Sequence, residues 1–296
     1  MNNAFDAWQI SHQARINKFL KKKLDKKNSK NTINDATNYA LLNGGKRFRA
    51  LLVYAIGEIN ATNQNVLDFV AASIEIIHAY SLTHDDLPEM DDDSLRRGLP
   101  SCHIKYGASQ AILAGDGLQS LAFEFLVSPD FIIDDAKKIN LISHLSKAIG
   151  INGMVFGQSL DMECSNKELD IKLLEKIQKK KTGELIHASC MMSYSISNFF
   201  DSSAEDCISK LAYLLGQLYQ ITDDILDGTS TSKDLGKTSG KDQKDNKATY
   251  VSIMGITESK KIKENLYFEI KNLVKQIPGN TQILNDLIDK IYARDY

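Results

Sequence analysis

Two clusters of aspartates close apolar segments of this chain, and they are its strongest candidates for chemistry. Residues 85–93 read DDLPEMDDD, and residues 223–227 read DDILD. Carboxylates are disfavoured at the C-terminal end of a helix, where the backbone carries partial negative charge, and neighbouring carboxylates also repel each other. The pattern therefore favours a bound cation, and hard divalent metals held by oxygen are the natural candidates.

The first cluster is strongly acidic. Residues 85–97 hold six acidic and two basic side chains, a local charge of −4. A solvated acidic turn is the ordinary interpretation of such a run. The preceding residues 73–84, SIEIIHAYSLTH, are too apolar for a surface helix, so we expect the acids at the mouth of a buried site. The spacing lacks the central glycine and closing glutamate of an EF-hand loop.

The second cluster closes another apolar stretch. Asp223 and Asp227 are four residues apart and so share one helix face, with Gln220 on a nearby face. One DDxxD string is weak evidence of function. Two such clusters, each at the end of an apolar helix, are much stronger evidence of a metal-dependent site.

A basic turn is the third feature. Residues 44–49 read GGKRFR, which places three cations at the start of a predicted helix. Cations are disfavoured there unless an anion is present, and free backbone N–H groups with Lys and Arg side chains make a phosphate site. A glycine break followed by solvated basic residues explains this segment equally well when it is taken alone.

Other polar residues could complete such a site. Arg96 and Arg97 follow the first cluster, where an arginine pair forms either surface salt bridges or a diphosphate clamp. His78 lies two helical turns before that cluster, although a lone helix histidine is more often a core residue. Lys181 and Thr182 precede a glycine that would interrupt their helix and bring a hydroxyl and a carbonyl close to a substrate.

Composition narrows the function classes. The 296 residues are 43% hydrophobic, enough for a substantial core, and the net charge of −2 gives no pull toward nucleic acid. The four cysteines are widely spaced, which predicts reduced thiols in a cytoplasmic protein. The N-terminus has no secretory signal pattern, and charged residues interrupt the longest apolar stretch, residues 67–82, so we predict no membrane span.

Helical periodicity runs along the whole chain, so we predict one all-α domain over residues 1–296. Residues 228–250 differ because they are rich in Ser, Gly, Lys and Asp, which predicts a long loop. The expected helices comprise one that ends before the glycines at 44–45, followed by residues 48–59, 65–86, 107–127, 135–162, 167–198 and 204–227.

The ordered motifs resemble those of the trans-isoprenyl diphosphate synthases, the polyprenyl synthetase family. The matching blocks, in chain order, are GGKRFR, IEIIHAYSLTHDDLPEMDDDSLRRGLPSCH, AGDGL, GQSLDM, KKTGELI, YQITDDILD, DLGKTSGKD and NKATY. The resemblance covers nearly the whole chain. It implies a helical bundle around a central active-site cavity, a homodimer, and a reaction of ionisation, condensation and elimination between allylic diphosphates and isopentenyl diphosphate.

The resemblance also implies roles for matching positions. Two of three magnesium ions would be held by Asp85, Asp86 and Asp91, and the third by Asp223 with Asp227 nearby. The allylic diphosphate would be held by Arg96, Lys181, Gln220 and Lys237. Isopentenyl diphosphate would be held by Lys46, Arg49, His78 and Arg97. Thr182 would help to stabilise the allylic cation. The catalytic set would be Asp85, Asp91, Arg96, Lys181, Thr182 and Asp223.

Product length is a finer expectation. In the family that this chain resembles, side chains just before the first aspartate motif form the floor of the tail cavity. Tyr80 and Ser81 occupy these positions, and the motif carries an additional Leu87-Pro88 pair. This combination is similar to that of synthases whose product is farnesyl diphosphate.

Three other functions remain open from the sequence. A geranyl or geranylgeranyl diphosphate synthase would share almost every residue above. A terpene cyclase is disfavoured because cyclases normally lack a GGKRFR-type site. A non-catalytic partner subunit is disfavoured because such subunits tend to lose aspartates that this chain retains.

Overall fold

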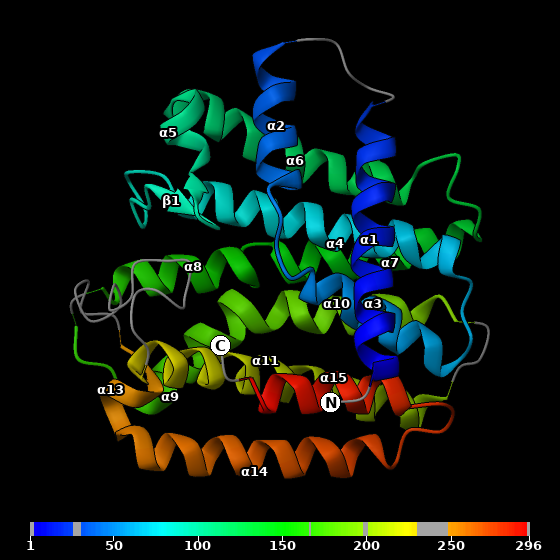
Figure 1. Ribbon diagram of the computed structural model, residues 1–296, viewed down its shortest axis with the longest axis vertical. Helices are drawn as coiled ribbons and strands as arrows, with labels where there is room; N and C mark the ends of the chain where they lie inside the picture. Colours follow the sequence, from blue (N-terminus) through cyan, green and yellow to red (C-terminus); the bar gives the residue numbers. More distant parts are fainter. Residues whose placement is uncertain (1–2, 26–30, 166, 198–200, 230–247, 295–296) are drawn as a thin grey trace. The chain divides into compact units, whose positions relative to one another are not determined.

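The computed structural model describes residues 3–25, 31–165, 167–197, 201–229 and 248–294 (Figure 1). The predicted ligand Lys237 and most of the predicted loop lie outside these ranges. Contacts divide the chain into two compact units. The first comprises Met1–Tyr54 and Thr62–Ile142, and the second comprises Ala55–Ala61 and Ser143–Tyr296. The single-domain organisation therefore stays a prediction, and each unit is described by itself.

Helices make up almost all of the first unit, which confirms the all-α fold class. A two-stranded antiparallel hairpin pairs Leu95 with Pro100 and Arg96 with Leu99. The elements that begin in this unit are α1 (Asn3–Asp25), α2 (Thr32–Leu42), α3 (Phe48–Ile59), α4 (Gln64–Asp85), β1 (Leu95–Arg96), β2 (Leu99–Pro100), α5 (Cys102–Tyr106), α6 (Ala108–Leu126) and α7 (Asp135–Ile149). α3 and α7 continue into the second unit.

α4 is the central helix of the first unit. Every residue from Leu67 to Ile77 is buried, and the helix runs alongside α6 (Figure 1). Within the described part of the chain, α4 alone is long and apolar enough to cross a membrane, but 72% of its apolar window is buried inside the structure. The core helix of a soluble protein has the same length and apolar composition. We therefore interpret α4 as a core helix, and the first aspartate cluster lies at its C-terminal end.

The second unit is built around α11, whose apolar stripe of Leu211, Leu215 and Leu218 is fully buried. α14 and α10 pack against this helix. The elements that begin here are α8 (Met154–Glu163), α9 (Ile171–Gln178), the π-helical turn η1 (Lys179–Gly183), α10 (Glu184–Ser195), α11 (Ser202–Thr229), α13 (Tyr250–Met254), α14 (Ile256–Val274) and α15 (Gln282–Tyr292).

Two predicted helices are wrong in their continuity. Residues 135–162 form two helices, because the chain turns at Gly150–Gly153, where the Gly153 N–H donates to the Gly150 carbonyl at 2.9 Å. A Cβ at Gly153 would lie 2.6 Å from the carbonyl carbon of Ala148, so this turn requires glycine. Residues 167–198 begin their helix only at Ile171, after Asp170 caps it, and contain the π-helical turn.

Candidate active site

The first aspartate cluster forms a folded turn at the end of α4. The Asp91 N–H donates to the Asp85 carbonyl at 2.8 Å, so these two residues lie side by side although six positions apart. Leu87, at 7% exposure, packs into an apolar cluster with Ala36 of α2, Cys102 of α5 and residues of α6. The Leu-Pro insertion therefore anchors the turn through its leucine, and both Asp85 and Asp91 remain half-buried.

Asp86 and Arg96 form an ion pair beside this turn. Arg96, on β1, donates from Nε to Asp86 at 3.0 Å, contacts Asp86 more closely through Nη2, and reaches Asp93 at 3.1 Å. Burial raises the pKa of the Asp86 carboxyl above its usual range, and the hydrogen bonds from Arg96 oppose that shift. The predicted magnesium ligand and the predicted diphosphate ligand are thus bound to each other here.

The donor chemistry of this turn fits magnesium. Asp85, Asp86 and Asp91 offer hard carboxylate oxygens, while the described residues contain no group of three His, Cys, Asp or Glu side chains arranged as a metal cage. Magnesium is normally held by one or two carboxylates together with water and substrate phosphates rather than by an all-protein cage. The carboxylates of this turn are therefore compatible with a magnesium site at which other oxygen ligands would complete the coordination.

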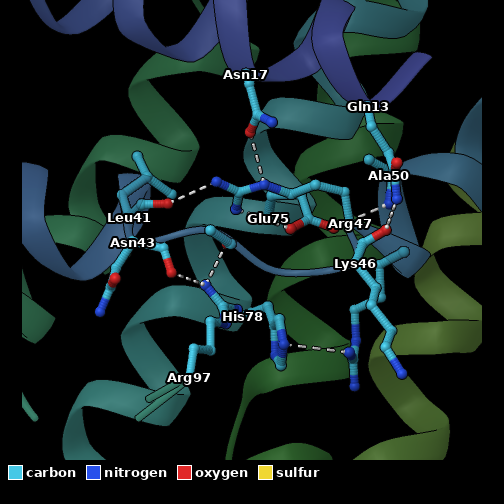
Figure 2. Close-up of polar contacts among 12 residues, drawn as sticks. Gln13, Asn17, Leu41, Asn43, Lys46, Arg47, Ala50, Glu75, His78 and Arg97 are labelled. Atoms are coloured by element: carbon cyan, nitrogen blue, oxygen red, sulfur yellow. Dashed lines mark hydrogen bonds and ion pairs between the residues drawn. The ribbon is translucent and has the colours of Figure 1, made fainter. Parts of the chain in front are cut away.

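The basic turn between α2 and α3, whose polar contacts are drawn in Figure 2, has an unusual backbone. Gly44, Gly45 and Arg47 have φ values of 73°, 112° and 51°, in the left-handed region that favours glycine. The Lys46 carbonyl accepts a hydrogen bond from Gln13 of α1 at 2.7 Å, and the Gly44 carbonyl accepts one from Arg97 at 2.5 Å. Arg97 therefore joins the chain that follows the first aspartate cluster to the basic turn.

One sequence expectation about this turn needs correction. The N–H of Ala50, in the first turn of α3, is not available to a phosphate, because the Oε1 atom of Glu75 accepts it at 3.0 Å. Glu75 also forms a buried ion pair with Arg47, whose Nη1 lies 3.2 Å from Oε2 (Figure 2). An internal carboxylate thus occupies the anion position at this helix N-terminus.

Arg49 and His78 lie together in the first unit. Nη1 of Arg49 is 3.4 Å from Nε2 of His78 (Figure 2). Burial lowers the pKa of His78 well below its usual range, and the positive charges of Arg49 and Arg97 lower it further. The imidazole is consequently neutral at physiological pH, and its Nε2 accepts the Arg49 hydrogen bond while Nδ1 carries the proton.

The two residues predicted to set product length lie on the last turns of α4. Tyr80 is half-buried, and its ring meets that of His84 edge-on with centroids 5.1 Å apart. Burial raises the pKa of the Tyr80 phenol, so the hydroxyl stays protonated. The Ser81 hydroxyl donates back to the His78 carbonyl at 3.0 Å, which orients it along the helix.

In the second unit, the second aspartate cluster has a divided role. Asp224 is buried and accepts hydrogen bonds from Gln220 at 2.9 Å and from the N–H of Tyr250 at 2.9 Å. Asp223 is half-buried and pairs with Arg294 at 2.6 Å. Asp224 therefore fixes the end of α11 to α13, while Asp223 and the half-buried Asp227 are the more accessible carboxylates.

The π-helical turn places Lys181 and Thr182, both half-buried, at the interruption that the sequence predicts. Nζ of Lys181 lies 2.7 Å from the carboxylate of Asp161, on α8. Gly157 allows α8 to contact this turn closely, because a Cβ there would lie 2.7 Å from the Cα of Lys181. π-Helical turns occur frequently at functional sites, since they leave backbone groups outside the regular hydrogen-bond ladder.

Sequence reasoning missed some polar partners of these residues. In the sequence, Glu75 is a single charged residue inside an apolar helix. Such a residue is expected to have a buried partner, but the sequence does not identify the partner. Arg294 gave no signal of its contact with Asp223. Asp161 was visible as a polar group in an apolar helix, which indicates a hydrogen-bond partner but does not identify it as Lys181. The two aspartate clusters lie in different units, so their meeting in one cavity stays a prediction.

An all-α fold with carboxylate turns and a cationic turn fits the class of helical enzymes that handle diphosphate esters with divalent cations. The polyprenyl synthetase family model matches residues 30–290. Farnesyl diphosphate synthase of Haemophilus influenzae is 42% identical over 273 residues, covering 92% of this chain and 92% of that protein. The chain belongs to the polyprenyl synthetase family.

Solved structures agree with this assignment. A geranyltransferase from Legionella pneumophila has a TM-score of 0.88 and 30% identity, covering 98% of this chain and 96% of that one. A geranyltransferase from Helicobacter pylori, complexed with magnesium and isoprenyl diphosphate, has a TM-score of 0.84 and 29% identity, covering 98% and 97%. The predicted isoprenoid-synthase fold is therefore confirmed.

Proposed function

We propose that this chain is a farnesyl diphosphate synthase, which condenses isopentenyl diphosphate first with dimethylallyl and then with geranyl diphosphate. The main support for the proposal is a hydrogen bond in the first unit, which Arg97 donates to the Gly44 carbonyl. It connects the segment after the first aspartate cluster to the basic turn. A carboxylate turn suited to magnesium and a cationic turn suited to a second diphosphate are what a two-substrate condensation needs.

The residues divide the work between two diphosphates. Lys46, Arg49, the neutral His78 and Arg97 hold isopentenyl diphosphate. Magnesium, up to three ions per site, would be held by the carboxylates of Asp85, Asp86 and Asp91 in the first unit and of Asp223 and Asp227 in the second, and would supply charge neutralisation to an allylic diphosphate. In the first unit, Arg96 would bind this diphosphate through its N–H groups, and the family resemblance gives the same role to Lys181, Gln220 and Lys237.

The reaction needs no protein nucleophile. The allylic C–O bond breaks and its electron pair leaves with diphosphate, and the alkene of isopentenyl diphosphate supplies the pair for the new C–C bond. A proton is then lost from the isopentenyl unit to the departing diphosphate. The contribution of Thr182 is to place its hydroxyl, from the π-helical turn, beside the allylic cation.

The test is incubation with dimethylallyl and isopentenyl diphosphates plus magnesium, followed by chromatography of the dephosphorylated products. Farnesol as the main alcohol supports the proposal. If geraniol or geranylgeraniol is the sole alcohol, the prenyltransferase activity is supported but the assignment of farnesyl diphosphate as its product is wrong. Cyclic terpenes or no turnover would reject the proposal.

We also propose a cytoplasmic homodimer without a nucleic-acid partner. Among the exposed large apolar side chains of the first unit are four on α6 and just before and within α7, namely Ile112, Leu113, Ile132 and Ile139, with exposures of 43%, 53%, 86% and 68%. Apolar side chains exposed singly are ordinary, so the homodimer is proposed from the family resemblance, with these four side chains as candidate contacts between two copies of the chain. Sedimentation of Ile139→Lys beside the parent protein tests this, and an unchanged dimer, or a monomeric parent, would contradict it.

A further inference from the structure

Arg47, the middle cation of the basic turn, points into the protein rather than toward a ligand. It is 3% exposed, and its guanidinium makes three contacts inside the first unit (Figure 2). Nε donates to Asn17 of α1 at 2.9 Å, and Nη2 donates to the Leu41 carbonyl of α2 at 2.8 Å. Nη1 meets Glu75 of α4 at 3.2 Å, so one side chain ties three helices together.

Glu75 completes this arrangement from the other side. It is 2% exposed and bonds to both Arg47 and the N–H of Ala50 in the first turn of α3. His78, one turn further along α4, accepts a hydrogen bond from Arg49 at 3.4 Å through Nε2. Two successive contacts from one face of α4 therefore hold the basic turn and the start of α3 in place.

The charge of Glu75 matters because the surroundings are cationic. Burial and the charge of Arg47 lower the pKa of Arg97, and Glu75 opposes that shift. Without Glu75, Arg47 would be a buried cation with two other cations, Arg49 and Arg97, nearby and no carboxylate to balance it. The basic turn would then open, because this lets the Arg47 guanidinium reach solvent. Removing one partner of a buried ion pair is costly for this reason.

We propose that Arg47 and Glu75 are positioning residues, which hold the basic turn in the shape that presents Lys46 and Arg49 to isopentenyl diphosphate, while Arg47 itself makes no contact with substrate. This inference rests on the proposed function. The three cations of the GGKRFR motif then have different roles. Lys46 and Arg49 bind the diphosphate, whereas Arg47 holds the turn through contacts inside the protein.

Glu75→Gln is the first test, because the amide can still accept from Ala50 but carries no charge. We expect the KM for isopentenyl diphosphate to rise about tenfold, the lower end of the losses found when a side chain that supports a metal ligand is removed, while the KM for geranyl diphosphate stays within about twofold. Equal increases in both KM values would overturn the proposal.

A double variant separates positioning from stability. Arg47→Met with Glu75→Met replaces the ion pair by apolar side chains, and such replacements are often neutral for folding. We expect the melting temperature of this protein to lie near that of the parent while its KM for isopentenyl diphosphate stays raised. A parental KM in the folded double variant would overturn the proposal, and this measurement decides the question if Glu75→Gln fails to fold.

The matched control is Asp68→Asn. Asp68, itself buried, forms another ion pair of the first unit with the half-buried Arg15 at 2.6 Å, and it accepts a hydrogen bond from Tyr54 rather than from the basic turn. We expect a lower melting temperature with both KM values unchanged, and a raised KM for isopentenyl diphosphate in this control would overturn the specific role of Glu75.

Arg49→Gln separates the inference from the proposed function. If Arg49→Gln leaves the KM for isopentenyl diphosphate unchanged, the assignment of the basic turn as its site fails, and the inference fails with it. If Arg49→Gln raises this KM and Glu75→Gln does not, only the positioning role is overturned.

Discussion

At the scale of single residues, environment decides what each polar group can do. His78 lies among arginines, and its low pKa keeps it neutral, so that it can accept a hydrogen bond from Arg49. Asp224 and Asp223 are neighbours in sequence, yet the first is buried among amide donors and the second is half-buried beside Arg294. The DDILD motif alone does not indicate which of its aspartates is buried and which is accessible.

Asp85→Asn should lower kcat about 100-fold or more, because a lost carboxylate weakens charge neutralisation by several kcal/mol. Raising the magnesium concentration should not restore the rate. The comparison is Asp134→Asn, which changes an exposed carboxylate of the same unit and should turn over like the parent protein. Full activity of Asp85→Asn at parental magnesium levels would reject the metal assignment.

Tyr80→Ala should lengthen the product. Its ring packs against His84 on the last turns of α4, and its removal opens space upstream of Asp85. The measurement is product chromatography with excess isopentenyl diphosphate, and we expect geranylgeranyl chains to appear. Ser81→Ala, which removes only a hydroxyl bonded to its own helix, should change the product less. An unchanged farnesyl product from Tyr80→Ala would show that another residue forms the floor.

At the scale of elements, the π-helical turn of the second unit is closely packed by its neighbours. Gly157 lies against its backbone on one side, and Gly216 of α11 approaches on another, where a Cβ would lie 3.1 Å from the Cα of Gly183. Glycine at these two positions allows two helices to touch the main chain directly. The position of Lys181 and Thr182 therefore depends on residues that carry no functional group.

Gly157→Ala should destabilise the protein by about 1–3 kcal/mol, because the added methyl overlaps main-chain atoms that cannot rotate away. It should also reduce kcat, since Lys181 and Thr182 move with that main chain. Denaturant unfolding and steady-state kinetics measure both effects. Ser159→Ala, on the exposed face of α8, should stay within about 0.5 kcal/mol of the parent, and equal stability of the two variants would contradict the packing argument.

At the scale of the whole molecule, the stability should depend on pH through the half-buried His187. Burial lowers the pKa of His187 to about 4, and this side chain stacks on Tyr213 and contacts Ser209 at 2.9 Å. An unfolded histidine titrates at about 6.5, so the unfolded chain binds the proton first as the pH falls. The stabilising contribution is complete above the unfolded pKa and is lost progressively toward pH 4.

His187→Gln should therefore flatten the acid side of the stability profile. The measurement is the melting temperature between pH 7 and pH 4.5 for the variant and the parent. The parent should lose more stability than the variant across this range, because glutamine binds no proton. Parallel profiles would show that His187 does not contribute to the acid sensitivity.

Much of this architecture follows from local sequence, and the remainder depends on contacts between distant residues. The glycines at 44–45 ended α2 as predicted, and Gly183 marked the interruption that proved to be a π-helical turn. The break at Gly150–Gly153 was missed because glycine inside a helical pattern predicts a kink and a turn equally well. Glu75 and Asp161 could not be paired with Arg47 and Lys181, since the pattern of one sequence does not indicate which charged side chains meet across the fold.

The apolar character of α4 has a consequence for biosynthesis. Residues 64–85 leave the ribosome before residues 108–126, so α4 is made before the helix that covers it. For that interval the nascent chain carries an apolar segment of 22 residues that meets the length and composition of a membrane span. Its aspartate-rich end emerges next, and those charges give the exposed segment a soluble flank while α6 is still being translated.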